Sequence, residues 1–354
     1  MKLTVRTPCN SMLGYGHVGL NILNSMENVD ISLFPIGNTF YPTFEVDSQK
    51  LEDWTEIQNF DKTSPCLTIW HEFLLITEHI GTGPMIGLPF WEIDWLNNHR
   101  VVNMNYCDHL IVASKWAKTV AEESGVTAPI TVIPMGVNRD IFNEHIVYID
   151  RNPEKYKFFN IGKIEKRKGH DILHKAFAKA FEDVDDVELH MFCHNGFLSK
   201  EELDNFHKEY AEVLGDKYVY HQQTMKDTAF ATEIVKLDCG VFPTRAEGFG
   251  LPILQSMSCG KPVIVMDYSA PTEFCNKDNA ILLPFTGKER ARDNKWFRGE
   301  AHWAKLDEDD LIEAMRYQYN NRDNNARNDA GIETAKSLPW EKTAHECLAC
   351  INEV

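Results

Sequence analysis

One stretch of the sequence, Val241–Gln255, contains residue types that suit an anionic ligand rich in hydroxyls. An apolar run is followed by Gly248 and Gly250 and then by a segment with helical spacing. Glycines let the backbone turn tightly and approach a ligand closely, and the N–H groups at a helix start attract phosphate. Glu247 stands just before this helix, and Gln255 stands about one turn into it. A phosphate-binding site flanked by two hydrogen-bonding side chains suits a nucleotide-sugar. The alternative interpretation is an ordinary strand–turn–helix.

A second stretch, Asn160–His170, adds positive charge. It has an apolar strand-like start and then four cations within six residues, which are Lys163, Lys166, Arg167 and Lys168. Lysines on such a loop neutralise a diphosphate from one side, while the helix that begins at Leu251 does so from the other. The alternative interpretation is a solvated basic loop.

His71 follows the apolar run Cys66–Trp70, which predicts a strand. Open α/β sheets place ligands at the carboxyl ends of their strands, so His71 is the best candidate for a catalytic or acceptor-orienting imidazole. A structural histidine is the alternative. Glu72, Glu92 and Asp94 would form a carboxylate pair for glycoside chemistry only if they lay close together. Ordinary loop or helix acids are the better interpretation of these three residues.

The sequence contains neither an Asp-x-Asp motif suited to a divalent ion with a diphosphate nor a cysteine–histidine metal spacing. We therefore expect no cofactor and no metal. The nine cysteines are scattered, which suits a reducing compartment. The N-terminus lacks an apolar leader, and no stretch approaches the roughly 18 apolar residues of a membrane span. These features predict a cytoplasmic protein without integral membrane contact.

Length and charge narrow the choice of architecture and partner. A chain of 354 residues suits two domains of ordinary size. The net charge of −17 disfavours a broad grip on nucleic acid or on anionic lipid, because both require basic surface.

Alternating strand and helix signals predict two doubly wound α/β units, the first over residues 1–150 and the second over 151–337. A polar linker at 143–153 separates them. The final segment, at about 338–354, reads as a separate terminal helix. The predicted strands of the first unit are 3–5, 31–36, 66–70, 85–88, 109–113 and 130–133, and those of the second are 157–161, 187–192, 218–221, 239–242, 262–266 and 280–283.

At this point the motifs match a known family. The chain resembles the retaining glycosyltransferases of the GT-B fold, family 4 type (glycosyl transferases group 1). The signatures occur in the family's order, and several ordered motifs are more specific than any one of them. They are Gly14-Tyr-Gly16, Ile133-Pro-Met-Gly-Val-Asn138, Gly162-Lys163 through Lys168-Gly169, Glu247-Gly-Phe-Gly-Leu-Pro, Gly260-Lys-Pro-Val-Ile-Val, Pro271-Thr-Glu273 and Trp340-Glu-Lys.

The resemblance implies two Rossmann-like domains facing across a cleft, with the last helix crossing back to the N-terminal, acceptor domain. The nucleotide-sugar donor would bind mainly to the C-terminal domain. Lys163 and Lys168 match the family's basic pair for the diphosphate, although arginine is commoner at Lys163 and would add a bidentate fork. Glu247 matches the acid that binds hydroxyls of the transferred sugar, and Gly248, Phe249, Gly250 and Leu251 supply backbone around the sugar and phosphates.

Three further positions take roles from the resemblance. Gly16 matches the loop that closes against the diphosphate, and His71 matches a histidine near the acceptor and donor sugar. Gln255 departs from the family, which usually has a glutamate that contacts the ribose. Glutamine still donates and accepts hydrogen bonds, so ribose binding would survive with a neutral contact.

The family transfers its sugar without a metal and with retention of configuration at the anomeric carbon. Departure of the nucleoside diphosphate leaves an oxocarbenium-like centre, and the acceptor attacks this centre from the face that the diphosphate leaves. The protein then has to stabilise the leaving group and position the acceptor. Two alternatives stay open, which are a GT-B phosphorylase or epimerase and a non-catalytic nucleotide-sugar-binding subunit. The acceptor could be a glycan, a small molecule, a protein or a modified nucleobase. Neither the donor nucleotide nor the oligomeric state follows from the sequence.

Overall fold

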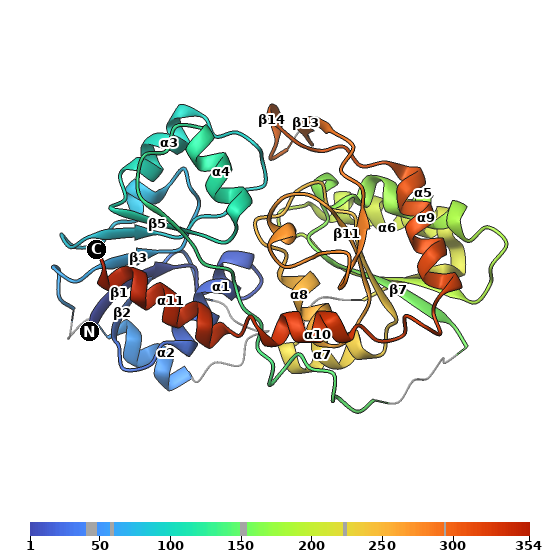
Figure 1. Ribbon diagram of the computed structural model, residues 1–354, viewed down its shortest axis with the longest axis horizontal. Coiled ribbons are helices and arrows are strands. Elements are labelled where there is room, and N and C mark those ends of the chain that lie inside the picture. The colour runs from blue at the N-terminus through green and yellow to red at the C-terminus, as the bar shows by residue number, and fades with distance from the viewer. Residues whose placement is uncertain (40–47, 57–59, 149–153, 222–224, 294) are drawn as a thin grey trace. The chain divides into compact units, whose positions relative to one another are not determined.

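The computed structural model describes residues 1–39, 48–56, 60–148, 154–221, 225–293 and 295–354. Its contacts divide the chain into a first unit, Met1–Asn138 with Leu338–Val354, and a second unit, Arg139–Ser337. Each unit contains a six-stranded parallel sheet, so the prediction of two Rossmann-like α/β halves is confirmed (Figure 1). The expected boundary after residue 150 and the end of the expected linker fall at 149–153, outside the described residues.

The sheet of the first unit has the strand order β2-β1-β3-β4-β5-β6, and all neighbours are parallel. Its central strands are apolar and buried on both faces, as parallel sheets covered by helices require. The strands are β1 (Lys2–Thr7), β2 (Asp30–Pro35), β3 (Cys66–Thr68), β4 (Met85–Gly87), β5 (His109–Val112) and β6 (Ile130–Val132).

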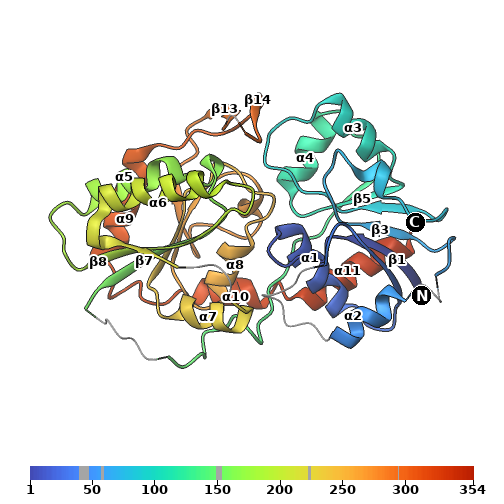
Figure 2. The ribbon, with the colours of Figure 1, turned by 180° about the vertical axis from the view of Figure 1, so that it is seen from behind.

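Helices cover both faces of this sheet. In both views α1, α2 and α11 lie on one side, and α3 and α4 lie on the other (Figures 1 and 2). The C-terminal helix α11 belongs to this unit, where it packs on α1 and where Thr343 Oγ1 donates to the Pro134 carbonyl at 2.8 Å. The helices are α1 (Gly14–Ser25), α2 (Ser48–Thr55), the 3₁₀ turn η2 (Leu75–Glu78), α3 (Asn98–Asn105), α4 (Lys115–Glu123) and α11 (Trp340–Asn352).

The sheet of the second unit has the order β12-β11-β10-β7-β8-β9, again with parallel neighbours throughout. Its strands are β7 (Tyr156–Gly162), β8 (Val187–Cys193), β9 (Tyr218–Tyr220), β10 (Cys239–Phe242), β11 (Val263–Met266) and β12 (Ile281–Leu283).

Two groups of helices sandwich this second sheet. In both views α5, α6 and α9 cover one face, and α7, α8 and α10 cover the other (Figures 1 and 2). The helices are α5 (His170–Ala180), α6 (Lys200–Leu214), α7 (Asp227–Val235), α8 (Leu251–Ser258), α9 (Glu308–Asn320) and α10 (Asp329–Lys336). Short 3₁₀ turns occur at η3 (Lys166–Lys168), η4 (Gly215–Lys217) and η5 (Ala270–Glu273).

One element of the second unit was not predicted from the sequence. An antiparallel hairpin, β13 (Lys288–Arg292) and β14 (Arg298–Ala304), lies between β12 and α9 and projects beyond the parallel sheet (Figure 1). The sequence of β13 is Lys-Glu-Arg-Ala-Arg, which lacks the apolar or β-branched residues that mark a strand. No helix in the part of the chain that the structure describes has both the length and the apolar character needed to span a bilayer.

The strand orders locate the ligand-binding edges. In the first unit the chain order reverses between β1 and β3, and in the second unit it reverses between β7 and β10. In open α/β sheets ligands bind outside the carboxyl ends of the strands at such a switch point. The Lys163–Lys168 loop follows β7 and the Glu247 loop follows β10, so the two stretches singled out in the sequence meet at the switch point of the second unit.

Candidate functional site

An ion pair between Lys168 and Glu247 joins the two loops at the switch point of the second unit. Lys168 Nζ donates to Oε1 of Glu247, and both side chains are largely buried, at 12% and 8% exposure. The Lys168 side chain also passes over Gly162, where an added Cβ would lie 3.5 Å from Lys168 Cε. Gly162 has φ 154°, which disfavours other residues.

Arg167 holds the other oxygen of the same carboxylate. Its Nη1 lies 3.0 Å from Oε2 of Glu247 and donates to the Ala246 carbonyl at 2.6 Å, while Nη2 donates to Glu165 at 2.9 Å. The Arg167 side chain is 7% exposed. Arg167 is therefore enclosed by protein acceptors and orients Glu247, whereas Lys168, the more exposed of the two cations, is the better candidate to meet a ligand.

The two cations keep Glu247 ionised. Burial raises the pKa of this carboxyl, but the charges and hydrogen bonds of Lys168 and Arg167 together oppose burial more strongly, so the pKa lies below its usual value of 4.5. A buried carboxylate that is ionised at neutral pH is a strong acceptor for hydroxyl groups.

The turn after Glu247 is shaped by Gly250, the residue before α8. Gly250 adopts φ 102°, a left-handed conformation that glycine accepts without strain. Leu251 begins the helix with Pro252 in its first turn, as predicted. Phe249 faces the interior and packs on Phe274 at 5.0 Å between ring centroids, so only its backbone is available to a ligand. Gly248 in the same turn is half-buried.

Gln255 lies in α8 and is 8% exposed. Its neutral amide is thus enclosed in the helix layer near the switch point, and its predicted contact with a ribose stays a prediction.

Ser269 holds the backbone of the loop that carries Glu247. Its Oγ accepts from the backbone N–H of Glu247 at 2.9 Å. Ser269 itself has φ 62° and ψ −154°, a combination that costs a non-glycine residue about 1–3 kcal/mol. Backbone strain of this kind persists where surrounding structure imposes it, and here it directs a side chain at the loop that carries Glu247.

A second arginine ties the two loops together. Arg245 donates to both oxygens of Asp171 on α5, at 2.7 and 3.0 Å, and through Nε to Glu289 of β13 at 2.6 Å. Its backbone N–H donates to the Arg167 carbonyl at 2.7 Å. The side chain is 5% exposed, so Arg245 is a structural cation.

His170, the first residue of α5, forms its hydrogen bonds as a neutral imidazole. Its Nδ1 accepts from the backbone N–H of Glu165 at 3.2 Å, and its Nε2 lies 2.9 Å from Oδ1 of Asn160. The proton therefore sits on Nε2. Burial, with help from Lys168, Arg167 and Arg245, lowers the pKa of His170 to about 3.

Lys163 contacts an aromatic ring. Its ammonium sits 5.2 Å from the ring centroid of Phe197, which belongs to the loop between β8 and α6. Phe197 in turn packs edge-on against Trp296 beyond β13, at 5.5 Å. The predicted pair of Lys163 and Lys168 is therefore divided between an aromatic contact and a carboxylate.

The switch point of the first unit carries His71 and Tyr15. Their rings are 4.7 Å apart, and His71 also contacts Trp70 at 4.6 Å and stacks on Phe73 at 5.0 Å. Tyr15 donates to the Phe90 carbonyl at 2.9 Å. His71 is thus half-buried in an aromatic cage.

The loop that the resemblance assigns to Gly16 is instead the first turn of α1, which begins at Gly14. A Cβ at Gly16 would meet the Asn10 carbonyl at 2.0 Å. Close packing on this carbonyl is a sufficient reason for a glycine, and the predicted contact of Gly16 with a diphosphate stays a prediction.

Glu72 is buried beside this cage at 2% exposure and pairs with Arg100 at 2.9 Å. Burial raises the pKa of Glu72 to about 7, although Arg100 opposes the shift.

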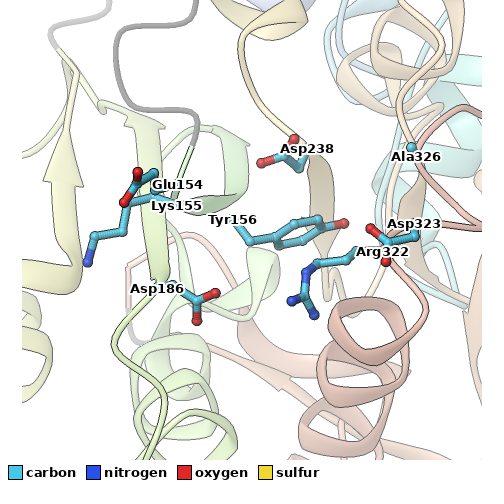
Figure 3. A pocket seen from close by; sticks show the side chains of 8 residues that line it. All are labelled: Glu154, Lys155, Tyr156, Asp186, Asp238, Arg322, Asp323 and Ala326. Carbon is cyan, nitrogen blue, oxygen red and sulfur yellow. The ribbon is translucent and has the colours of Figure 1, made fainter.

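A hollow of about 250 Å³ lies elsewhere in the second unit, lined by Glu154, Lys155, Tyr156, Asp186, Asp238, Arg322, Asp323 and Ala326 (Figure 3). Asp186 and Asp238 precede β8 and β10, and Tyr156 begins β7, so the hollow sits at the amino ends of these strands. Ligands of this fold bind at the opposite ends. The hollow is therefore separate from the switch-point site. Among the residues that the structure describes, no group of three or more His, Cys, Asp or Glu side chains could hold a metal ion.

Sequence reasoning missed four residues of these clusters, which are Tyr15, Arg167, Arg245 and Ser269. Arg167 and Arg245 were visible as cations beside Lys168 and Glu247, and Tyr15 stands between the two singled-out glycines. Nothing local to the sequence marks Ser269, because its role depends on a backbone conformation set by the fold.

The match to a known protein family falls in the second unit. Residues 142–293 match the family model described as glycosyl transferases group 1. This span lies within the second unit and contains Lys163, Lys168, Glu247 and Gln255. No curated protein matches the chain.

Solved structures match the whole chain at low identity. A sucrose-phosphate synthase from Thermosynechococcus elongatus matches with a TM-score of 0.70 and 14% identity, over 100% of this chain and 98% of the other. Anabaena HepE, in complex with UDP and glucose, matches with a TM-score of 0.72 and 12% identity over 100% of both chains. A glycosyltransferase from Rickettsia africae gives a TM-score of 0.70 and 13% identity over 99% and 98%. The chain therefore has the GT-B fold, and its second unit matches the glycosyl transferases group 1 family.

Proposed function

We propose that the protein is a retaining glycosyltransferase that moves a sugar from a nucleoside-diphosphate-sugar to a hydroxyl acceptor without a metal ion. The observation that carries this proposal is the buried, ionised Glu247, held by Arg167 and Lys168 at the switch point beside the start of α8. A carboxylate for sugar hydroxyls and a cation for phosphate are thus neighbours on one edge of the sheet.

Lys168 and the N-terminal turn of α8 would hold the diphosphate. Lys168 now donates to Glu247, and its flexible stem lets the ammonium move to a phosphate oxygen when the donor binds. Glu247 would keep Arg167 as its partner and would turn its freed oxygen toward the hydroxyls of the transferred sugar. The ion pair of Lys168 and Glu247 would thus hold both charges in place before the donor binds. When the donor binds, Lys168 would change its partner to a phosphate oxygen, and the freed oxygen of Glu247 would turn to the sugar.

In the reaction the bond between the anomeric carbon and the phosphate oxygen breaks, and its electron pair leaves with the diphosphate. Lys168 and the α8 N–H groups would stabilise this negative charge, which is the main electrostatic task of the site. The acceptor oxygen would then bond to the oxocarbenium-like carbon on the face that the diphosphate leaves, and the proton of the acceptor hydroxyl would pass to the departing diphosphate. Lys163 would add charge at the diphosphate after leaving its contact with Phe197.

Roles for the first unit rest on the resemblance. His71 would act near the transferred sugar and the acceptor, and Gly16 would approach the diphosphate. The acceptor class and a cytoplasmic location likewise stay predictions.

The complex of HepE with UDP and glucose makes UDP the first nucleotide to test. Gln255 is a reason to test other nucleotides in parallel, because the residue expected to contact the ribose is neutral here. UDP-, GDP-, ADP- and dTDP-sugars should be compared by thermal shift, since a ligand that binds only the folded state raises its stability. Slow hydrolysis of the stabilising donor would then report chemistry without a known acceptor.

Two other functions remain to be compared with transfer. A phosphorylase or epimerase on the same fold would give a sugar phosphate or an isomerised donor, which product analysis distinguishes. A non-catalytic subunit would bind the donor and leave it intact at every enzyme concentration. The transfer proposal is contradicted if no nucleotide-sugar stabilises the protein.

A further inference from the structure

The β13–β14 hairpin carries positive charge in an otherwise acidic chain. Residues 288–305 contain six Lys or Arg and three Asp or Glu, whereas the whole chain has a net charge of −17. Along β13 the cations Lys288, Arg290 and Arg292 occupy alternate positions, and all three are exposed. Alternate residues of a strand point to one face at a spacing of about 7 Å. The strand thus presents a row of exposed cations, although its pairing with β14 shifts register between Arg290 and Arg292.

The opposite strand continues this row. Arg298 of β14 pairs directly with Arg292 and is also exposed. Arg290 donates to the Gly299 carbonyl at 2.9 Å, and Arg292 donates to the Arg298 carbonyl at 3.3 Å. Across the described ranges no carboxylate pairs with Arg290, Arg292 or Arg298. Their charges are therefore available to a ligand.

The inner face of the hairpin is fixed to the Glu247 loop. Trp303 is fully buried, and its Nε1 donates to Oε1 of Glu289 at 3.0 Å. The same oxygen accepts from Arg245 at 2.6 Å, and the Ala304 N–H donates to the Arg245 carbonyl at 2.9 Å. Arg245 stands two residues before Glu247. The hairpin that carries the cations is therefore bonded to the segment that leads to Glu247.

An exposed aromatic pair lies beside the row. Trp296, between β13 and β14, and Phe197 are 49% and 54% exposed and meet edge to face at 5.5 Å. Lys163 contacts the far side of this pair through Phe197. Exposed aromatic faces beside cations suit a chain that alternates apolar sugar faces with negative groups.

We propose that the outer face of the hairpin, formed by Arg290, Arg292 and Arg298 with Trp296, binds an anionic oligosaccharide or polysaccharide that serves as the acceptor, in addition to the acceptor contacts that the resemblance assigns to the first unit. The inference rests on the proposed function, because transfer requires a hydroxyl-bearing acceptor near the donor site. A row of separated charges matches repeated anionic groups better than it matches a single phosphate. The acidic remainder of the chain disfavours extended nucleic acid.

The direct test measures binding of four probes of matched length by fluorescence anisotropy, with labelled protein. The probes are a heparin decasaccharide, a hyaluronan decasaccharide, neutral maltodecaose and single-stranded dT10. A fifth measurement uses vesicles of phosphatidylcholine with phosphatidylserine. We expect the two anionic oligosaccharides to bind more tightly than maltodecaose by at least tenfold, with an affinity that falls as salt rises.

Substitutions in the hairpin test whether it is the surface that binds the oligosaccharides. The triple variant Arg290→Gln, Arg292→Gln, Arg298→Gln should weaken oligosaccharide binding at least tenfold and reduce its dependence on salt. The control, Lys175→Gln, Lys208→Gln, Lys336→Gln, changes net charge equally at exposed helix positions and should alter affinity less than twofold. Trp296→Ala should weaken binding without changing the salt dependence.

Donor binding separates the two proposals. The triple variant should keep the thermal shift that a nucleotide-sugar gives to the native protein. If the native protein binds no nucleotide-sugar, the proposed function fails whatever the hairpin does. If donor binding is intact, the acceptor inference is overturned by equal effects of the triple variant and its control, by equal binding of maltodecaose, or by tighter binding of dT10 or vesicles.

Discussion

Nη1 of Arg167 lies 3.0 Å from Oε2 of Glu247, and this contact crosses the switch point between β7 and β10. Lys168 holds the other oxygen. Two adjacent residues of one loop therefore bind the same carboxylate, but Arg167 is enclosed by the Ala246 carbonyl and Glu165, while Lys168 sits at the more open end. We therefore expect Arg167 to position the carboxylate and Lys168 to bind the ligand.

Lys168→Ala should reduce turnover of the donor by about 100-fold or more, because one cation that stabilises a leaving group contributes about that much. Its stability should change little, since Glu247 keeps Arg167. The matched control is Lys166→Ala, which removes an exposed cation from the same loop and should alter turnover less than about threefold. Steady-state donor hydrolysis by both variants decides the matter, and equal losses would contradict a special role for Lys168.

Arg167→Ala should mainly lower stability. Removal of one partner from a buried ion pair costs about 3–5 kcal/mol, because the remaining charge loses its compensation. Arg167→Lys should recover part of this loss, since it restores the charge but not the fork that reaches Glu165, Ala246 and Glu247. Urea unfolding monitored by fluorescence measures the difference. An unchanged unfolding midpoint in Arg167→Ala would show that the guanidinium does not hold the loop.

Much of this architecture was predictable because apolar periodicity and glycine turns are local signals. Every predicted strand of the two sheets is present, with ends shifted by a residue or two. The basic loop and the Glu247 turn were recognised from residue types alone. Residue types indicated that the two loops flank one diphosphate, but they do not reveal the strand order of the sheet, which places both loops at one switch point.

Other features depended on tertiary structure and were missed for that reason. The hairpin strand Lys288–Arg292 consists mostly of charged residues, and it is stabilised by the buried contacts of Trp303 and Glu289 with Arg245. The different burial and partners of Arg167 and Lys168 are set by the fold, and a run of cations does not reveal them. The glycine at position 16 looked like part of a loop, although it packs inside the first turn of α1.

Ser269 offers a test of stored backbone strain. Ser269→Ala and Ser269→Gly both lose the hydrogen bond that Oγ accepts from the Glu247 N–H. Only glycine also relieves the strain of φ 62°, so Ser269→Gly should be the more stable of the two by about 1 kcal/mol. Unfolding free energies in urea give the comparison. A less stable glycine variant would mean that the conformation is not strained.

The pKa shifts of the partly buried His221 and the buried Glu72 predict opposite responses of stability to pH. Burial lowers the pKa of His221 to about 4, so between pH 6.5 and 4 the unfolded chain binds more protons and stability falls as pH falls. Burial raises the pKa of Glu72 to about 7, so its contribution to stability is full below pH 4.5 and is lost as pH rises toward 7.

Substitution of these two residues should separate the two pH ranges in which stability is lost. His221→Gln should flatten the loss of stability below pH 6.5, and Glu72→Gln should flatten the loss between pH 4.5 and 7. Melting temperatures from pH 4 to 8 measure both slopes. His221 and Glu72 lie in different units, so each variant serves as the control for the other. A variant that leaves its own slope unchanged would contradict the assignment for that residue.

The most direct test of the account is donor binding by Glu247→Gln, which keeps the shape of the side chain and removes its charge. Isothermal titration of the native protein with the nucleotide-sugar found by thermal shift should give a defined affinity. Glu247→Gln should weaken binding of the nucleotide-sugar by at least tenfold while it changes the affinity for the free nucleoside diphosphate less than threefold, because the role proposed for Glu247 is to bind the sugar. Equal affinity of the native protein and Glu247→Gln for the nucleotide-sugar would contradict the central claim.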